Sequence, residues 1–260
     1  MKNIKAQDVC KIFQKGQEQL AVLGPLSFEI SPGEFLCVLG ESGCGKSTLW
    51  RILAGLEKPS SGQVYMDEEE IVGTDHRRGV VFQNPALLPW LTVEENVALG
   101  FKIRAEKIPK DLIQETINLV GLEGFEKTKP GNLSGGMAQR TAIARALVSN
   151  PEVLLMDEPF AALDALTRLR MQEALLDIWN KHRTTVVFIT HDIDEAIALA
   201  SRIIVMTPRP GQVGCIFQIP LAYPRLRSST EFLHLKGIIS DQLIQSFNDS
   251  KNSMQAFTKA

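Results

Sequence analysis

The chain has 260 residues, 44% of them hydrophobic and 22% charged, which is typical of a folded globular protein and excludes a disordered, collagen-like or disulfide-scaffold chain. Its 28 lysines and arginines nearly balance its 30 aspartates and glutamates, so no strong overall field favours nucleic acid or anionic lipid as a partner. At about 150 residues per domain, the length predicts one large domain or two small ones.

The cysteines and the first residues indicate in which cellular compartment the protein is expected. The four cysteines are scattered without a paired metal-ligand spacing, which predicts reduced thiols in a cytoplasm. The residues after Met1 form a mixed segment rather than a continuous apolar run, so we expect no secretory signal. No window of about 18 apolar residues without charge occurs, so any membrane role is expected to depend on a partner.

The first part of the chain predicts strands followed by a glycine-rich turn and a helix. Alternating runs at residues 8–13 and 20–30 surround a polar turn containing Gly16, a pattern typical of antiparallel strands. Phe35–Leu39 is a compact apolar run of the kind buried in a central sheet. Glycines follow it directly, and residues 49–56 then show helical spacing.

Later apolar runs predict further buried strands, with helical stretches between most of them. These runs lie at residues 79–82, 153–156, 185–189 and 203–206. Residues 111–120 and 135–148 show helical periodicity, and no strong strand lies between them. We therefore expect an α/β fold with a mostly parallel sheet, an N-terminal antiparallel β subdomain and an inserted helical subdomain.

The predicted organisation is a single domain over residues 1–260. Within it, the helical subdomain covers about residues 84–150, and a C-terminal extension covers residues 212–260. The extension is expected to hold one amphipathic helix before a polar tail at residues 248–260.

A phosphate-binding loop is the most specific motif. Residues 40–47 fit the pattern G-x-x-x-x-G-K-[ST] between a buried strand and a helix start. Glycines let backbone N–H groups point at phosphate oxygens, Lys46 supplies a cation to the β and γ phosphates, and the Ser47 hydroxyl can ligate Mg²⁺. The motif predicts that the core of the α/β fold is that of a P-loop NTPase. The predicted nucleotide-binding residues of this loop are Gly40, Glu41, Ser42, Gly43, Cys44, Gly45, Lys46, Ser47 and Thr48.

Two carboxylates end the predicted strand at residues 153–156. An acidic pair in this place is, by itself, more often a helix cap or a solvated loop. Beside a phosphate loop, Asp157 is suited to hold the magnesium shell, and Glu158 can polarise a water for attack on the γ-phosphate.

A second phosphate-type site precedes the helix that runs to Val148. Ser134, Gly135 and Gly136 form a helix N-terminus suited to an anion. One nucleotide needs one phosphate loop, so this N-terminus either caps its own helix or serves a nucleotide held by another molecule. The combination of motifs favours the second interpretation.

A phosphate loop, a Leu-Ser-Gly-Gly helix start and an apolar-Asp-Glu strand, in this order, resemble the ATP-binding cassette ATPases over about residues 5–211. The resemblance implies that Gln83 senses magnesium and the attacking water, and that His191 contacts the γ-phosphate. It also implies that Asp164 belongs to a loop reaching across a dimer, and that Phe13 stacks on adenine.

The resemblance implies three sets of site residues and two cofactors, ATP and Mg²⁺. The catalytic set is Lys46, Gln83, Glu158 and His191; the magnesium set is Ser47, Gln83 and Asp157; and the set acting on the partner's nucleotide is Ser134, Gly135, Gly136 and Asp164.

Other segments resemble one branch of the family, the bacterial importers for nitrate, sulfonates and taurine. The commonest family string ends Leu-Ser-Gly-Gly-Gln, whereas Met137 follows the two glycines here. Further resemblances to this branch lie at residues 84–92, 157–168, 208–211 and 223–225.

The segment Pro85–Leu91 holds two prolines and five apolar side chains, Trp90 among them. It predicts a hydrophobic groove that binds a helix, and in cassette importers this region resembles the surface that receives a coupling helix from the membrane subunit. The alternative is ordinary packing beneath the helical insert.

The leading interpretation is the ATPase subunit of a multi-subunit importer, peripheral on the cytoplasmic face of the inner membrane. Its expected partners are a second ATPase chain, most simply in a homodimer, integral membrane permease subunits and indirectly a solute-binding protein, but no nucleic acid. The alternative is a soluble cassette ATPase without a permease, acting in cluster assembly, repair or translation. A non-cassette P-loop kinase would lack the Ser134–Gly136 element.

Overall fold

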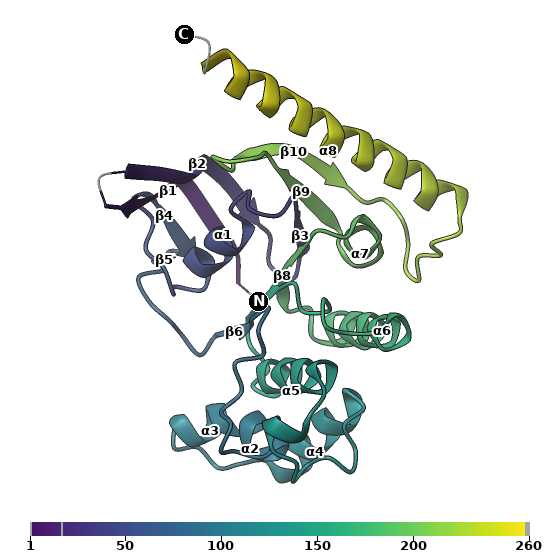
Figure 1. Cartoon of the computed structure of the whole chain (residues 1–260). Helices are drawn as coiled ribbons and strands as arrows, with labels where there is room; N and C mark the ends of the chain where they lie inside the picture. Colours follow the sequence, from purple (N-terminus) through teal and green to yellow (C-terminus); the bar gives the residue numbers. More distant parts are fainter. Residues whose placement is uncertain (1, 17, 258–260) are drawn as a thin grey trace. The chain divides into compact units, whose positions relative to one another are not determined.

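The computed structural model describes residues 2–16 and 18–257, with side chains described for residues 2–14, 16 and 18–245 (Figure 1). The chain divides into two compact units. The mid-chain unit is Asp75–Thr184, and the terminal unit joins Lys2–Thr74 to Thr185–Ala260. In the part of the chain that is described, no helix is both long and apolar enough to cross a membrane.

The terminal unit begins with an antiparallel sheet whose strand order is β2-β1-β4-β5. Its long strands β1 and β2 confirm the antiparallel prediction for the first thirty residues. In the second half of β2, Leu26, Phe28 and Ile30 are buried while the residues between them are exposed, so one face of the sheet packs on the core. The bounds are β1 Ile4–Lys15, β2 Glu18–Ile30, β4 Ser61–Met66 and β5 Glu69–Glu70.

A second set of strands in this unit places β3 between two parallel neighbours, β8 and β9, with β10 antiparallel to β9. Every residue of β3 and β8 is buried, which explains why these strands are continuous apolar runs rather than alternating ones. Leu39 pairs with Thr190 and with Val205, so the segments that follow the three parallel strands begin at one edge. The bounds are β3 Phe35–Leu39, β8 Thr185–Thr190, β9 Arg202–Met206 and β10 Val213–Gln218.

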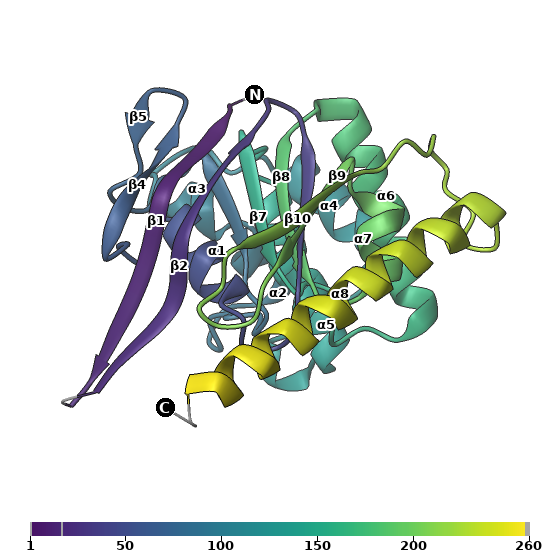
Figure 2. The same ribbon diagram turned by 90° about the horizontal axis from the view of Figure 1, so that it is seen from above.

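The helices of the terminal unit are α1 (Lys46–Leu53), α7 (Ile193–Leu199) and α8 (Thr230–Phe257). Figures 1 and 2 both show α8 beside α7. Helix α8 contains the predicted amphipathic helix, and its backbone continues into the predicted polar tail because no glycine or proline follows Gly237. Side chains of that tail lie outside the described residues.

The mid-chain unit pairs two parallel strands, β6 (Arg78–Val81) and β7 (Val153–Asp157). Helical segments fill most of the chain between and after them, and in Figure 1 α2, α3 and α4 lie together below α5. Helices α4 and α5 confirm the helical periodicity of residues 111–120 and 135–148. The bounds are α2 Val93–Val97, α3 Leu99–Ile103, α4 Lys110–Leu119, a 3₁₀ turn Pro130–Asn132, α5 Gly135–Leu147 and α6 Ala165–His182.

Candidate functional site

The phosphate loop joins β3 to α1 and depends on glycine for its path. Gly43 and Gly45 have φ angles of 84° and 108°, a region that costs little only for glycine. A Cβ on Gly45 would lie 2.6 Å from Leu23 Cδ2 and 3.0 Å from the Val22 carbonyl. Gly45 is the N-cap of α1, and no side chain caps this helix. Its first N–H groups are therefore available to an anion.

Lys46 is held at the start of this helix by the loop itself. Its side chain is 5% exposed, and Nζ donates to the carbonyls of Gly40 at 2.6 Å and Glu41 at 2.8 Å. Ser47 follows it in the first turn. The loop thus fixes a buried cation next to backbone donors, which is the arrangement that binds a phosphate group.

The thiol of Cys44 lies inside the same loop and is 2% exposed. Burial raises its pKa, which the nearby charge of Lys46 only partly offsets. Because the thiolate is the reactive form, we expect iodoacetamide at mildly alkaline pH to modify the half-buried Cys10 well before Cys44. Mass spectrometry of peptides at increasing labelling times measures this order. Cys10 and Cys44 should react at equal rates only when the protein is unfolded in urea. Equal rates in the folded protein would show that the loop opens readily.

A cavity of about 470 Å³ lies beside the phosphate loop. It is lined by Leu20 and Ala21 of β2, by residues 41–44 and by residues 208–210. Arg209 donates from Nε to the Gly43 carbonyl at 2.9 Å. In sequence, residues 208–211 resemble one branch of importers, and this resemblance predicts no role for them in the site. No periodicity or charge pattern marks this contact in the sequence.

His191 directly follows β8, at the edge where Gly40 follows β3, because Leu39 and Thr190 are paired. The turn around it is tightly bonded. The N–H of Asp192 donates to Thr190 Oγ1 at 3.0 Å, and the Thr190 hydroxyl donates to the Glu195 carboxylate at 2.7 Å. The structure therefore places Lys46 and His191 at one edge of the same sheet.

In the mid-chain unit, Gln83 and Glu158 follow the paired strands β6 and β7. Gln83 Nε2 donates to Glu158 Oε2 at 3.3 Å. Glu158 has a φ of 45°, which is strained for a residue with a side chain, and such strain concentrates at functional sites. The preceding Asp157 is 6% exposed. The structure thus brings together the two residues predicted to act on the attacking water.

Ser134 and Asp164 both cap helices of the mid-chain unit. Ser134 Oγ accepts from the Met137 N–H at 3.2 Å, and Asp164 Oδ1 accepts from the Thr167 N–H at 3.0 Å. Hydrogen bonds from Thr167 lower the pKa of the Asp164 carboxyl below its usual value. The two caps lie close together, since a Cβ on Gly136 would be 3.4 Å from the carbonyl oxygen of Ala162, two residues before Asp164.

The predicted magnesium residues fit that ion by their chemistry. Ser47, Gln83 and Asp157 offer a hydroxyl, an amide oxygen and a buried carboxylate, all oxygen donors of the kind Mg²⁺ prefers. Among the described residues, no group of three or more His, Cys, Asp or Glu side chains could hold a metal ion. A set with a single carboxylate suits Mg²⁺, which keeps waters and binds substrate phosphates rather than an all-protein cage.

Phe13 lies near the end of β1, opposite Leu20 of β2. The ammonium of Lys11 is 4.9 Å from the centre of its ring, so a cation already contacts the ring. The role of Phe13 in adenine stacking stays a prediction.

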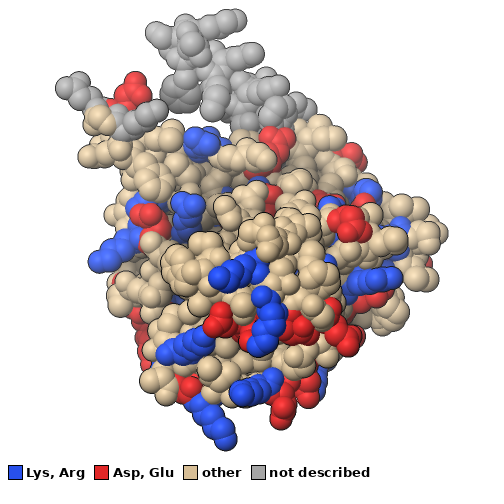
Figure 3. Space-filling model, turned by 60° about the horizontal axis from the view of Figure 1, so that its bottom comes forward, with Lys and Arg blue, Asp and Glu red and all other residues tan. Residues whose placement is uncertain are grey.

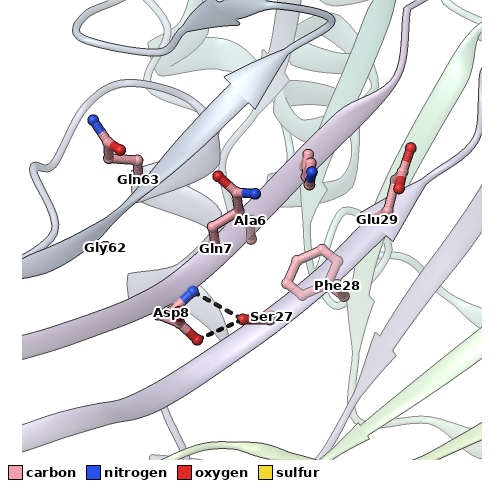
Figure 4. Close-up of a pocket in the computed structure, with 9 residues that line it drawn as sticks. Ala6, Gln7, Asp8, Ser27, Phe28, Glu29, Gly62 and Gln63 are labelled. Carbon is pink, nitrogen blue, oxygen red and sulfur yellow. Dashed lines mark hydrogen bonds between the residues drawn. The ribbon is translucent and has the colours of Figure 1, made fainter.

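A cavity of about 640 Å³ lies on the antiparallel sheet and contains none of the predicted site residues (Figure 4). Ser27 lies between the N–H and the carboxylate of Asp8, at 2.8 Å and 2.9 Å. These polar groups satisfy one another at a bulge of β1, so the cavity shows no arrangement for chemistry.

The segment Pro85–Leu91 contains no helix, and two polar side chains are hydrogen-bonded to its backbone. Arg145 donates from both terminal nitrogens to carbonyls of this segment at 2.8 and 2.9 Å. The fully buried Asn96 accepts from the Leu88 N–H at 2.9 Å and donates back to its carbonyl at 3.2 Å. Trp90 remains 65% exposed. A rigid backbone therefore presents a large apolar side chain at the surface.

Charged side chains of both signs are interspersed on the face that Figure 3 shows. Lys102 pairs with Glu95 at 3.5 Å, and Arg104 pairs with Glu106 at 2.8 Å. The face in Figure 3 therefore carries no large region of one sign.

Residues 23–161 match the profile of the family described as ABC transporter. The chain is 45% identical to the aliphatic sulfonates import ATP-binding protein SsuB of Bacillus thuringiensis, over 92% of this chain and 95% of that one. It is 46% identical to the ABC transporter ATP-binding protein MJ0412 of Methanocaldococcus jannaschii, over 94% and 93%.

Among solved structures, the chain is similar to the ATP-binding cassette MJ0796, in a dimeric post-hydrolysis state bound to ADP and Pi. The TM-score is 0.77 at 35% identity, over 84% of this chain and all of the other. This similarity confirms the predicted fold class, with its N-terminal antiparallel sheet and mostly parallel sheet with helices.

Proposed function

Because the chain belongs to the ABC transporter ATP-binding proteins, which hydrolyse ATP to drive transport, we propose that it energises an importer for a small anionic solute of the nitrate, sulfonate or taurine kind. The observation that carries this assignment is similarity to the SsuB relative along nearly the whole chain. Met137 and the Pro-Arg-Pro-Gly segment at residues 208–211 support the same branch.

The proposal assigns nucleotide binding to the phosphate loop. The backbone N–H groups of residues 40–48 would bind the phosphates, Lys46 would neutralise the β and γ phosphates, and Phe13 would stack on adenine. Bound Mg²⁺ would neutralise charge on the β and γ oxygens. Its holders in this chain would be Ser47, Gln83 and Asp157.

Hydrolysis is assigned to the remaining polar residues. Glu158 would accept a proton from the attacking water, and Gln83, bonded to that carboxylate at 3.3 Å, would orient the same water. His191 would donate to a γ-phosphate oxygen. The firm turn around His191 supports this role because catalysis of phosphoryl transfer depends mainly on positioning.

A second copy of the chain is the proposed partner in hydrolysis. Ser134, Gly135, Gly136 and Asp164 would contact the nucleotide held by that copy. The closeness of Gly136 to the segment before Asp164 supports their common action. The dimeric arrangement of the similar cassette MJ0796 supports the pairing of two chains.

The remaining partners are permease subunits in the membrane and, through them, a solute-binding protein. The chain would then be peripheral on the cytoplasmic face of the inner membrane. We place its contact with the permease at Pro85–Leu91, where Trp90 is exposed over a backbone fixed by Arg145 and Asn96. An exposed aromatic side chain on a rigid segment is typical of the centre of a binding surface.

Trp90→Arg is expected to weaken permease binding and uptake while ATP binding is retained. A charge in an apolar contact costs about 2 kcal/mol, or about thirty-fold in affinity. Co-purification with the permease from membranes, uptake of labelled taurine or alkanesulfonate, and ATP affinity measure the three properties.

The matched control is Val72→Arg, which adds the same charge at a residue that is 71% exposed in the terminal unit. Normal permease binding by Trp90→Arg would show that the contact surface is elsewhere. If deletion of the chain leaves uptake of every tested sulfonate, nitrate and taurine unchanged, the solute assignment is wrong.

A further inference from the structure

The segment after β10 binds the end of α7 through two side chains. The Tyr223 hydroxyl donates to the Leu199 carbonyl at 2.6 Å. Arg225 Nη1 donates to the carbonyls of Ile197 and, at 2.6 Å, Ala200. Helix α7 ends at Leu199, so these are carbonyls that lack a partner within the helix. The hydroxyl and the guanidinium therefore cap its C-terminus.

This cap is itself rigid. The guanidinium carbon of Arg225 lies 4.1 Å from the centre of the Tyr223 ring, and its Nε donates to the Leu221 carbonyl at 2.9 Å. Among the described residues, Arg225 makes no ion pair with a carboxylate. A half-buried cation bonded to backbone carbonyls at a helix C-terminus also interacts favourably with the helix dipole.

Helix α8 binds the other end of α7. Lys236 Nζ donates to Asp194 Oδ2 at 2.8 Å, and Asp194 is in the first turn of α7. Phe232 and Ile239 of α8 are fully buried. The C-terminal extension therefore contacts α7 at both ends. Both ribbon views draw α8 beside α7 (Figures 1 and 2).

The start of α7 fixes the turn that carries His191. Asp192, its N-cap, accepts from the N–H groups of Asp194 at 2.8 Å and Glu195 at 3.1 Å. Glu195 is 5% exposed and accepts the hydroxyl of Thr190. Thr190 and Asp192, on either side of His191, are thus hydrogen-bonded to each other and to residues of α7. Any shift of α7 would move His191.

We propose that Tyr223 and Arg225 are positioning residues for His191 and act on it through α7. The proposal rests on the role assigned above to His191 in ATP hydrolysis. It gives the Tyr-Pro-Arg segment at residues 223–225 a function in the ATPase reaction. It also makes the C-terminal extension part of the catalytic apparatus.

Arg225→Met keeps the apolar stem and removes the guanidinium. We expect kcat for ATP to fall about ten-fold with KM changed by less than about two-fold, because the nucleotide still binds while His191 is displaced. Tyr223→Phe removes only a hydroxyl and is expected to lower kcat about three-fold. Arg225→Lys should restore part of the activity. The controls are Arg170→Met, at an exposed residue of α6, and Tyr65→Phe.

A double-mutant cycle separates positioning from general destabilisation. In a His191→Ala background, Arg225→Met should cause no further loss of kcat, since the residue it positions is gone. The same ten-fold loss in that background would overturn the proposal. If Arg225→Met does not fold, Tyr223→Phe enters the same cycle with the same expectation.

A readout independent of activity is the NMR spectrum of ¹⁵N-histidine-labelled full chain, which has four histidines. The His191 ring signals, assigned by their loss in His191→Ala, should shift or broaden in Arg225→Met, while those of His76 and His182 stay in place. Unchanged His191 signals would overturn the proposal. If His191→Ala hydrolyses ATP normally, the catalytic role of His191 fails instead, and the spectrum alone decides whether Arg225 positions the ring.

Discussion

Replacement of Lys46 by alanine is expected to reduce kcat/KM for ATP about a hundred-fold or more. The Lys46 ammonium is fixed by the carbonyls of Gly40 and Glu41 at 2.6 and 2.8 Å, so it meets the phosphates without reorganisation. Loss of one such preorganised contact costs on the order of 3 kcal/mol in the transition state. Phosphate release at several ATP concentrations and equilibrium binding of ATP measure the two parts of the effect.

The matched control is Lys58→Ala, which removes an exposed ammonium from the same unit. It should leave kcat/KM unchanged within about two-fold. Because Lys46 is buried, thermal melting must show that Lys46→Ala is folded at the assay temperature. Hydrolysis by the folded variant within three-fold of the unmutated rate would contradict the assigned role.

The phosphate loop and its sheet could be predicted because their signals are local. Residues 40–47 are consecutive, and the second glycine that the motif demands, Gly45, has positive φ, as does Gly43 within the loop. The continuous apolar run of Phe35–Leu39 correctly indicated a fully buried strand. The rule that parallel strands end at one edge then places His191 next to the loop, as the register of β3 and β8 shows.

Contacts between a side chain and a distant carbonyl could not be predicted in this way. Arg209 binds the Gly43 carbonyl 166 residues away, and Arg225 binds carbonyls at the end of α7. A backbone carbonyl is present at every residue, so such a contact leaves no pattern in composition, periodicity or spacing. The left-handed backbone of Glu158 was equally hidden, since glutamate does not favour that conformation.

The roles proposed for Ser134 and Asp164 could not be decided from the sequence for a different reason. Each side chain accepts from an N–H of the helix that it begins, as a cap does in any protein. An N-cap and an anion-binding N-terminus use the same residue types, so the sequence predicts both. A second chain is needed to distinguish them.

Glu158→Gln is the substitution best suited to separate binding from hydrolysis. Glu158 Oε2 accepts from Gln83 Nε2 at 3.3 Å, and a glutamine carbonyl oxygen in that place can accept the same hydrogen bond. The backbone strain at φ 45° is unchanged, because glutamine and glutamate have the same Cβ. What is lost is the capacity to take a proton from water, which is worth about 10² to 10⁴ in rate.

We therefore expect Glu158→Gln to bind ATP with nearly unchanged affinity, to hydrolyse it at least about a hundred-fold more slowly, and to accumulate as a dimer. If two chains enclose the nucleotide through Lys46 of one and Ser134 of the other, a nucleotide that is not hydrolysed keeps them joined. Size-exclusion chromatography with saturating ATP and magnesium measures the dimer.

The matched control is Glu123→Gln, at an exposed residue of the same unit, which should elute at the same position as the unmutated chain. Adding Lys46→Ala to Glu158→Gln should abolish the dimer. A Glu158→Gln protein that binds ATP but remains monomeric would contradict the shared site, because the trapped nucleotide would then be held by one chain alone.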